Sequence, residues 1–294
     1  MFQINWKLKA FLYKVFQFLR LKKTLYFIQK YITRRSKINI QKIDPHWERH
    51  EFSIRKNNCI DLLEIGAGKS LDQNIYFSYI FNNKLKQTAI DINKMIDFNL
   101  FNDASLIISN LLNLDFKGKV TNQEDVLNKY NIQYLAPQKL SDLPEKKFDI
   151  CVSTTTLEHF SLQDLNDFLL DVKKILKDDG LVSSIIDYSD HYSHTDKNIN
   201  SLNFLKFDEN EWVKYNNSYL YQNRLRHQDY RELFNDFNYK IKIEHKGNST
   251  EKFQNISKKF DANNDETFLC WGYYLLSINS VSYTHLTLPT NLSV

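Results

Sequence analysis

The chain is poor in the residues that build unusual scaffolds. Its 294 residues include only 6 glycines, 4 prolines and 3 cysteines. So few glycines and prolines exclude a collagen-like or glycine-rich architecture. The cysteines are too scattered for a disulfide scaffold and show no zinc-ligand spacing, so a reducing, cytoplasmic setting is expected. With 42% hydrophobic and 14% aromatic residues, the chain can still form a sizeable core.

Acidic residues are missing from the first 43 positions, which hold eleven lysines and arginines. Subtracting these eleven charges from the net charge of +4 leaves −7 for the rest of the chain. A mildly acidic body predicts no nucleic-acid partner. The basic segment itself favours contact with something anionic.

Long apolar runs are also missing, because charges interrupt every run before the roughly 20 residues that a membrane-spanning helix needs. Residues 6–20 instead have the pattern of an amphipathic helix, and residues 1–43 are predicted to be a basic helical extension. Two interpretations stay open: the helix lies on an anionic leaflet at the inner face of a membrane, or its aromatic face packs on the main domain or on a second subunit. The predicted apolar face comprises Leu8, Phe11, Leu12, Val15, Phe16, Phe18 and Leu19.

Residues 44–280 are predicted to form one α/β domain, because short apolar runs alternate with helical stretches. Short buried strands of this kind favour a mostly parallel sheet with helices on both faces. The last strand is expected to run antiparallel, since no helix links it to a parallel partner. The helix at 165–176 is expected to end at Gly180 in a left-handed cap. Predicted strands are 59–65, 87–90, 132–135, 148–153, 181–186, 239–243 and 268–276.

The last stretch fits nothing before it. Residues 282–290 resemble a translated vector read-through, so we treat residues 281–294 as a non-native tail.

Ligands of such sheets bind beyond the carboxyl ends of the strands, so the turn after the first strand is informative. Gly66, Ala67 and Gly68 form this turn, and Glu64 precedes it by two residues. A Walker A loop would need a glycine at position 63, which is leucine. An acidic residue before the turn suits a ligand with a positive ammonium group, such as S-adenosylmethionine.

A nicotinamide cofactor remains an alternative, although the third glycine of a dinucleotide loop would stand at position 71, which is leucine. The second strand ends at Asp91. Its carboxylate can accept hydrogen bonds from the two hydroxyls of a ribose, which both cofactors carry. Alternatively, it caps a helix or stabilises a turn by accepting a backbone N–H.

Four segments, 62–68, 89–91, 148–159 and 174–182, together resemble the class I S-adenosylmethionine-dependent methyltransferases. The pairing of Leu-Glu-His after the fourth strand with Leu-Lys-x-x-Gly at the end of the next helix is the most specific part. The resemblance covers about residues 59–190. It implies a Rossmann-like seven-stranded sheet with the last strand antiparallel, and methyl transfer from S-adenosylmethionine.

The resemblance also implies roles in cofactor binding. Glu64 and the glycine turn would face the methionine part, Asp91 the ribose and Ile92 the adenine. Ala136 would lie near the adenine, where many members have an acidic residue, and Gln138 or a backbone group would replace that carboxylate.

The same resemblance places Ser153 and Thr154 beside the methionine. The adjoining Glu158 and His159 are expected to open the next helix and hold its turn by hydrogen bonds, rather than to act in catalysis.

The insert at about residues 188–226 holds most of the remaining reactive side chains and is predicted to be a lid or substrate pocket. A hydroxyl acceptor must lose a proton, and His191 or His194, oriented by Asp187, is a candidate base. A polar network that fixes the insert is the alternative. The acids and histidines of this loop fit no metal signature, so no metal is predicted. Arg224 and Arg226 would bind an anionic substrate or pair with acids of the domain.

The sequence therefore predicts S-adenosylmethionine-dependent methyl transfer to an oxygen of a small-molecule or saccharide-like acceptor. The alternatives are a non-catalytic adenosylmethionine-binding module and an NAD-dependent oxidoreductase. The oligomeric state is left open.

Overall fold

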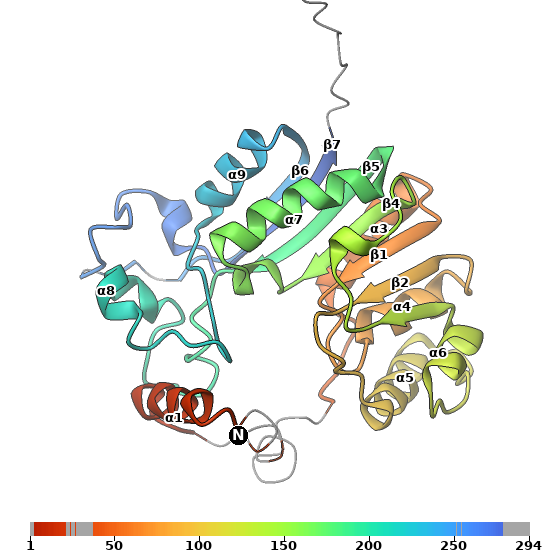
Figure 1. Ribbon diagram of the computed structural model, residues 1–294, viewed down its shortest axis with the longest axis horizontal. Coiled ribbons are helices and arrows are strands. Elements are labelled where there is room, and N and C mark those ends of the chain that lie inside the picture. The colour runs from red at the N-terminus through yellow and green to blue at the C-terminus, as the bar shows by residue number, and fades with distance from the viewer. Residues whose placement is uncertain are drawn as a thin grey trace, which may run out of the picture.

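The computed structural model describes residues 3–21, 24, 27, 38–250, 252–253 and 255–278. The expected tail, residues 281–294, lies outside the described residues. The centre of the structure is a seven-stranded sheet with helices on both faces (Figure 1). Its strands are β1 (Asp61–Ile65), β2 (Lys86–Ile90), β3 (Ile132–Leu135), β4 (Phe148–Thr154), β5 (Leu176–Asp187), β6 (Tyr239–Lys246) and β7 (Trp271–Ile278).

The strand order is β3-β2-β1-β4-β5-β7-β6. Strands β1 to β5 pair in parallel, whereas β7 pairs antiparallel with both β5 and β6. This confirms the predicted mostly parallel sheet and the antiparallel last strand. The chain runs outward from β1 to β3 and then returns to β4, so the order reverses between β1 and β4, where sheets of this kind bind ligands.

Two apolar layers cover the sheet because successive strand residues point to opposite faces. In β1, Leu62 joins one buried cluster and Leu63 the other. The helices α3 (Pro45–Lys56), α4 (Asp72–Ile80), α5 (Phe98–Leu112) and α6 (Gln123–Tyr130) cover the first face. The helices α7 (Leu162–Ile175) and α9 (His227–Asp236) cover the second (Figure 1).

The predicted helix end at Gly180 is wrong. Helix α7 ends at Ile175, β5 begins at the next residue, and Gly180 lies inside β5 without a positive φ. Leu176 is fully buried and pairs with Phe148 of β4. Burial and strand pairing therefore outweigh the local pattern that favoured a glycine cap.

The insert at 188–226 has an apolar cluster of its own, in which α1 (Trp6–Phe18) takes part. The Trp6 ring lies 4.6 Å from that of Tyr215, and the Trp6 backbone N–H donates to Asp196 Oδ2 at 2.9 Å. The insert is thus a packed layer rather than an open loop. It carries η4 (Asn203–Lys206) and α8 (Glu209–Trp212), and η5 (Asp265–Phe268) of the β6–β7 connection packs beside it.

Helix α1 packs on the main domain through a different face from the one predicted. Trp6, Ala10 and Tyr13 are buried, whereas Phe11 is 63% and Phe18 86% exposed. The basic side is accommodated because the Lys9 ammonium donates to Thr195 Oγ1 at 3.2 Å. Among the described helices, none combines the length and apolar character that crossing a bilayer requires.

A buried polar network ties α3 to the sheet beneath the glycine turn. His50, which is fully buried, hydrogen-bonds through Nδ1 to Ser183 Oγ (2.7 Å) and through Nε2 to Thr154 Oγ1 (3.0 Å). Burial lowers the pKa of His50 to about 3. The ring is therefore neutral in the folded protein and binds strands β4 and β5 together with α3.

This buried ring predicts a loss of stability in acid. Unfolded histidine takes up a proton below about pH 6.5, whereas folded His50 does not do so until about pH 3, so the unfolded state binds more protons in between. The contribution of His50 is complete above pH 6.5 and falls by about 1.4 kcal/mol per pH unit below it. Denaturant unfolding at pH 7, 6 and 5 should show a smaller loss in His50→Gln than in wild type. Equal pH dependence in the two proteins would contradict this.

Candidate functional site

A cavity of about 1030 Å³ opens at the carboxyl ends of β1, β2 and β4. Its wall includes Gly66, Asp91 and His159. Tyr219 and Tyr221 of the insert complete it. The cavity therefore lies where the strand order reverses, and the insert forms part of its wall.

The glycine turn after β1 is shaped by two positive φ angles, +77° at Gly66 and +74° at Gly68. A Cβ on Gly66 would lie 2.4 Å from Thr156 Oγ1, so this glycine permits close contact with the loop after β4. A Cβ on Gly68 would meet nothing within 4 Å. The backbone at Ala67 and Gly68 thus leaves a cradle that a ligand can approach closely.

Glu64 is buried on the β1 side of this turn but does not line the cavity. Burial raises the pKa of its carboxyl to about 8, against the opposing effect of hydrogen bonds to Gln73 and Asn74. Its Oε2 atom has no hydrogen-bond partner in the part of the chain that the structure describes. At neutral pH the carboxyl is therefore largely protonated unless a cation comes close.

Asp91 and Ile92 follow β2 and both line the cavity. Asp91 is 9% exposed, and its Oδ1 accepts the backbone N–H of Asn93 at 2.9 Å. It thus shapes its own turn, as the alternative interpretation expected, while facing the cavity. Ile92 is 76% exposed, so its side chain is open to a ligand.

The loop after β3 places Gln138, not Ala136, on the cavity wall. Ala136 packs against the core instead.

The loop after β4 also lines the cavity with residues other than those expected. The Ser153 hydroxyl donates to Ser184 Oγ, and the Thr154 hydroxyl donates to Gln73 Oε1. The cavity is lined by Thr155 and Thr156, two residues further along. Sequence reasoning missed these two threonines, because the run of three threonines gives no sign of where the strand ends.

The insert brings its histidines together beside the cavity. The rings of His191 and His194 stack at 5.1 Å, and His159 packs on His191 at 4.9 Å. His191 Nε2 lies 3.3 Å from Asp187 Oδ2, and the His194 Nε2 atom lies 3.2 Å from Ser189 Oγ. The three residues predicted for catalysis are thus neighbours, and His159 connects them to the cavity wall.

The electrostatics of this cluster differ between its two acids. Burial alone would raise the pKa of the Asp187 carboxyl. Hydrogen bonds from His191 and Ser189, together with the charge of His191, outweigh burial and hold this pKa below its ordinary value. Burial, with the charge of Asp187, raises the pKa of Glu158 well above its ordinary value. Burial lowers the pKa values of His159 and His194.

The expected role of Glu158 in its turn is wrong. Glu158 and His159 do open a short turn, η3 (Leu157–His159), but neither carboxylate oxygen of Glu158 has a hydrogen-bond partner within the described segments. Its side chain therefore does not hold the turn. His159 makes its hydrogen bond to the backbone oxygen of Tyr221 in the insert.

The two arginines of the insert act on the backbone. Arg224 donates to the carbonyls of Phe204 and Phe207 and pairs with Glu209. Arg226 donates to the carbonyls of Tyr188, Thr267 and Leu269. Both are buried, so they hold the insert together and do not face an anionic substrate.

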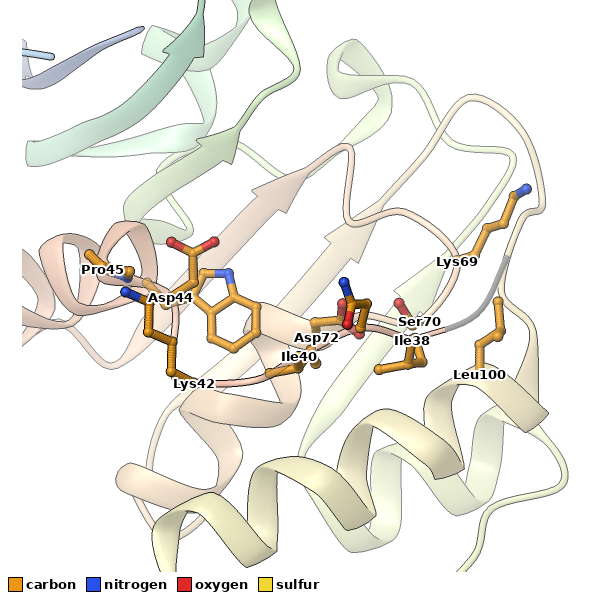
Figure 2. A pocket seen from close by; sticks show the side chains of 11 residues that line it. Ile38, Ile40, Lys42, Asp44, Pro45, Lys69, Ser70, Asp72 and Leu100 are labelled. Atoms are coloured by element: carbon orange, nitrogen blue, oxygen red, sulfur yellow. The ribbon is translucent and has the colours of Figure 1, made fainter. Parts of the chain in front are cut away.

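A second cavity, of about 620 Å³, opens on the other side of the glycine turn (Figure 2). Lys69, Ser70 and Asp72 line it on one side, and Lys42 and Asp44 on the other. None of the residues predicted for cofactor binding or catalysis lines it, so the larger cavity is the candidate active site.

Comparison with known proteins gives one match to a protein family. Residues 104–184 match the family described as a methyltransferase domain. No curated protein matches the chain.

Several solved structures are similar in fold. The YcgJ protein of Bacillus subtilis is 15% identical, with a TM-score of 0.42 over 79% of this chain and 97% of that one. The 1,6-didemethyltoxoflavin-N1-methyltransferase of Burkholderia thailandensis is 12% identical, with a TM-score of 0.47 over 86% and 85%. A SAM-dependent methyltransferase of Archaeoglobus fulgidus is 12% identical, with a TM-score of 0.44 over 79% and 94%.

The geometry of the site fits S-adenosylmethionine on two counts. A Cβ on Gly68 would occupy open space at the turn, and Glu64 holds a buried oxygen that has no hydrogen-bond partner among the described residues, although neither residue lines the cavity itself. The seven-stranded sheet with its antiparallel last strand is the one that the resemblance implied. These features agree with the match of residues 104–184 to the methyltransferase-domain family.

Proposed function

We propose that the protein transfers the methyl group of S-adenosylmethionine to an oxygen of a small-molecule or saccharide-like acceptor. One observation carries this proposal: a single cavity is lined both by Gly66 of the glycine turn and by His159, the first of a row of three imidazoles. Tyr219 and Tyr221 give the wall between them an aromatic and polar character that suits a sugar or another small polar molecule.

In this proposal the cofactor spans the ends of β1 and β2. Asp91 would accept the ribose hydroxyls, and Ile92 would cover the adenine. The methionine part would lie along the glycine turn, where its ammonium would favour the ionised form of Glu64. Thr155 and Thr156 would border the methionine in place of Ser153 and Thr154, whose hydroxyls are used inside the fold.

Methyl transfer is a direct displacement at a sulfonium methyl group, so the protein mainly has to align the two reactants and exclude water. In this proposal the insert, which lines the cavity with Tyr219 and Tyr221, helps to exclude water. A hydroxyl acceptor also has to lose its proton. His191, with Asp187 and His194 beside it, is the group placed to promote that loss.

Calorimetry with the two competing cofactors tests the cofactor assignment. S-adenosylmethionine should bind the full-length protein, and NAD should not. Gly68→Ala should weaken S-adenosylmethionine binding about tenfold or more, because the new methyl group occupies the cradle and the residue keeps a positive φ. Binding of NAD without binding of S-adenosylmethionine would favour the oxidoreductase alternative.

Removal of one imidazole tests the catalytic assignment. His191→Ala should lower kcat by about a hundredfold or more, as expected for loss of a group that assists proton removal. The Kd for S-adenosylmethionine should stay the same, because His191 does not line the cavity. Cofactor binding in wild type without turnover on any hydroxylated acceptor would favour the non-catalytic binding module.

We further propose that α1 places the enzyme on an anionic membrane surface at the inner face of a membrane. Leu8, Phe11 and Phe18 are 50%, 63% and 86% exposed on the side of α1 opposite its buried residues. Residues 1–43 carry eleven basic side chains and no acid. Exposed apolar side chains within a purely basic segment suit phospholipid headgroups of negative charge.

Vesicle sedimentation tests this surface. The full-length protein should sediment with phosphatidylglycerol vesicles more than with phosphatidylcholine vesicles, and Phe11→Ser/Phe18→Ser should reduce that binding several-fold. Leu162→Ser is the control, because Leu162 is 56% exposed on α7, outside this helix. Wild-type sedimentation unaffected by the double substitution, or self-association through α1 in analytical ultracentrifugation, would overturn the proposal.

A further inference from the structure

We propose that Glu158, His159 and His191 hold a divalent transition-metal ion at the wall of the active-site cavity, and that this ion binds the acceptor hydroxyl. One donor atom from each of the three residues can be chosen so that all lie within 4.8 Å of one another. The proposal rests on the proposed function, because it names how the histidine cluster would act on an oxygen acceptor.

The first argument is the free-energy cost of burying the Glu158 carboxylate. This side chain is 3% exposed, and neither of its oxygens has a hydrogen-bond partner among the described residues. A buried carboxyl group without partners is costly, and buried charges in proteins are normally paired or coordinate a metal. A cation beside Glu158 supplies the missing partner.

The second argument is the orientation of the two imidazoles. His159 Nδ1 lies 2.7 Å from the backbone oxygen of Tyr221. A carbonyl oxygen only accepts, so Nδ1 carries the proton and donates it, and the lone pair lies on Nε2. Metal-ligating histidines usually have such a partner on the second nitrogen, which fixes the tautomer and the ring.

His191 is held in a comparable way by its backbone. Its backbone N–H donates to the Gln222 side chain, which fixes the loop that carries the ring. Asp187 Oδ2, 3.3 Å from His191 Nε2, supplies a further carboxylate at the edge of the cluster. The donors therefore come from two loops that the fold brings together, at the ends of β4 and β5.

The donor set indicates the class of ion. Two imidazoles with one or two carboxylates suit divalent first-row metals, whereas magnesium prefers oxygen ligands and water. Three protein ligands leave coordination positions open, and His159 lines the cavity from which an acceptor would enter. Sequence spacing gave no sign of this set, because His191 lies 32 residues after His159, on a separate loop.

The ion would act as a Lewis acid on the acceptor. The hydroxyl bound to it loses its proton to water, its oxygen forms a bond to the methyl carbon, and the carbon–sulfur bond breaks. The electron pair of that bond stays on sulfur, which becomes the thioether of S-adenosylhomocysteine. In this arrangement His191 is a metal ligand, and the proton does not pass to its ring.

Metal binding by the full-length protein tests the proposal without a known acceptor. Protein treated with a chelator and dialysed should bind Mn²⁺ and Co²⁺, followed by electron paramagnetic resonance and by elemental analysis, and either ion should raise the Tm. Mg²⁺ should bind more weakly. Glu158→Gln should weaken Mn²⁺ binding at least about tenfold. Glu232→Gln, an exposed acid on α9, is the matched control and should bind as wild type does.

His159→Ala gives a second variant, which should fold because His159 lies on the cavity wall and not in the apolar core. It should also lose Mn²⁺ affinity while S-adenosylmethionine still binds. Wild-type protein that binds S-adenosylmethionine but none of these ions, or equal Mn²⁺ affinity in Glu158→Gln and wild type, would overturn the metal site and leave the proposed function standing. Absence of S-adenosylmethionine binding would instead remove the proposed function itself.

Discussion

The need to satisfy buried acids at one edge of the sheet governs this structure. Parallel strands bring their carboxyl ends together, so Glu64, Asp91 and Asp187 gather at the ends of β1, β2 and β5, and Glu158 follows β4. Glu64, Asp91 and Glu158 are buried at this edge, and an unpaired charge is costly there. Each carboxyl group there is stabilised by a hydrogen bond, by protonation or by a nearby cation. Which of these applies differs from one acid to the next and determines the chemistry of the site.

The insert at this edge is itself held by polar contacts with the backbone. Arg224 and Arg226 donate to five carbonyls of the insert and of the β6–β7 connection, where an irregular chain would otherwise leave these oxygens unpaired. Trp6 of α1 fills the apolar cluster beneath. The N-terminal helix and the insert therefore form one layer, and a change in α1 can reach the cavity wall.

The sequence predicted the sheet well, because strand alternation, the glycine turn and Asp91 are local patterns that the parallel fold preserves. The sequence-based predictions were wrong where tertiary packing determines which of several nearby residues is buried. Leu176 enters the core and draws Gly180 into β5, and α1 buries Trp6 in place of Phe11. Thr155 and Thr156, not Ser153 and Thr154, reach the cavity because β4 extends to Thr154. The histidine cluster depends on two distant loops, which spacing along the chain does not reveal.

Glu64 and Glu158 are both glutamates whose burial is costly, but they are suited to different cations. Both are buried glutamates at a strand end, and both hold a carboxylate oxygen without a partner. Burial keeps Glu64 neutral at rest, and its hydrogen bonds with the amides of Gln73 and Asn74 favour ionisation when an organic ammonium approaches. Glu158 has no such amides and instead faces two imidazole rings, which are ligands rather than counter-ions while they are neutral. The neighbours of each acid, more than its burial, therefore determine which cation it is suited to bind.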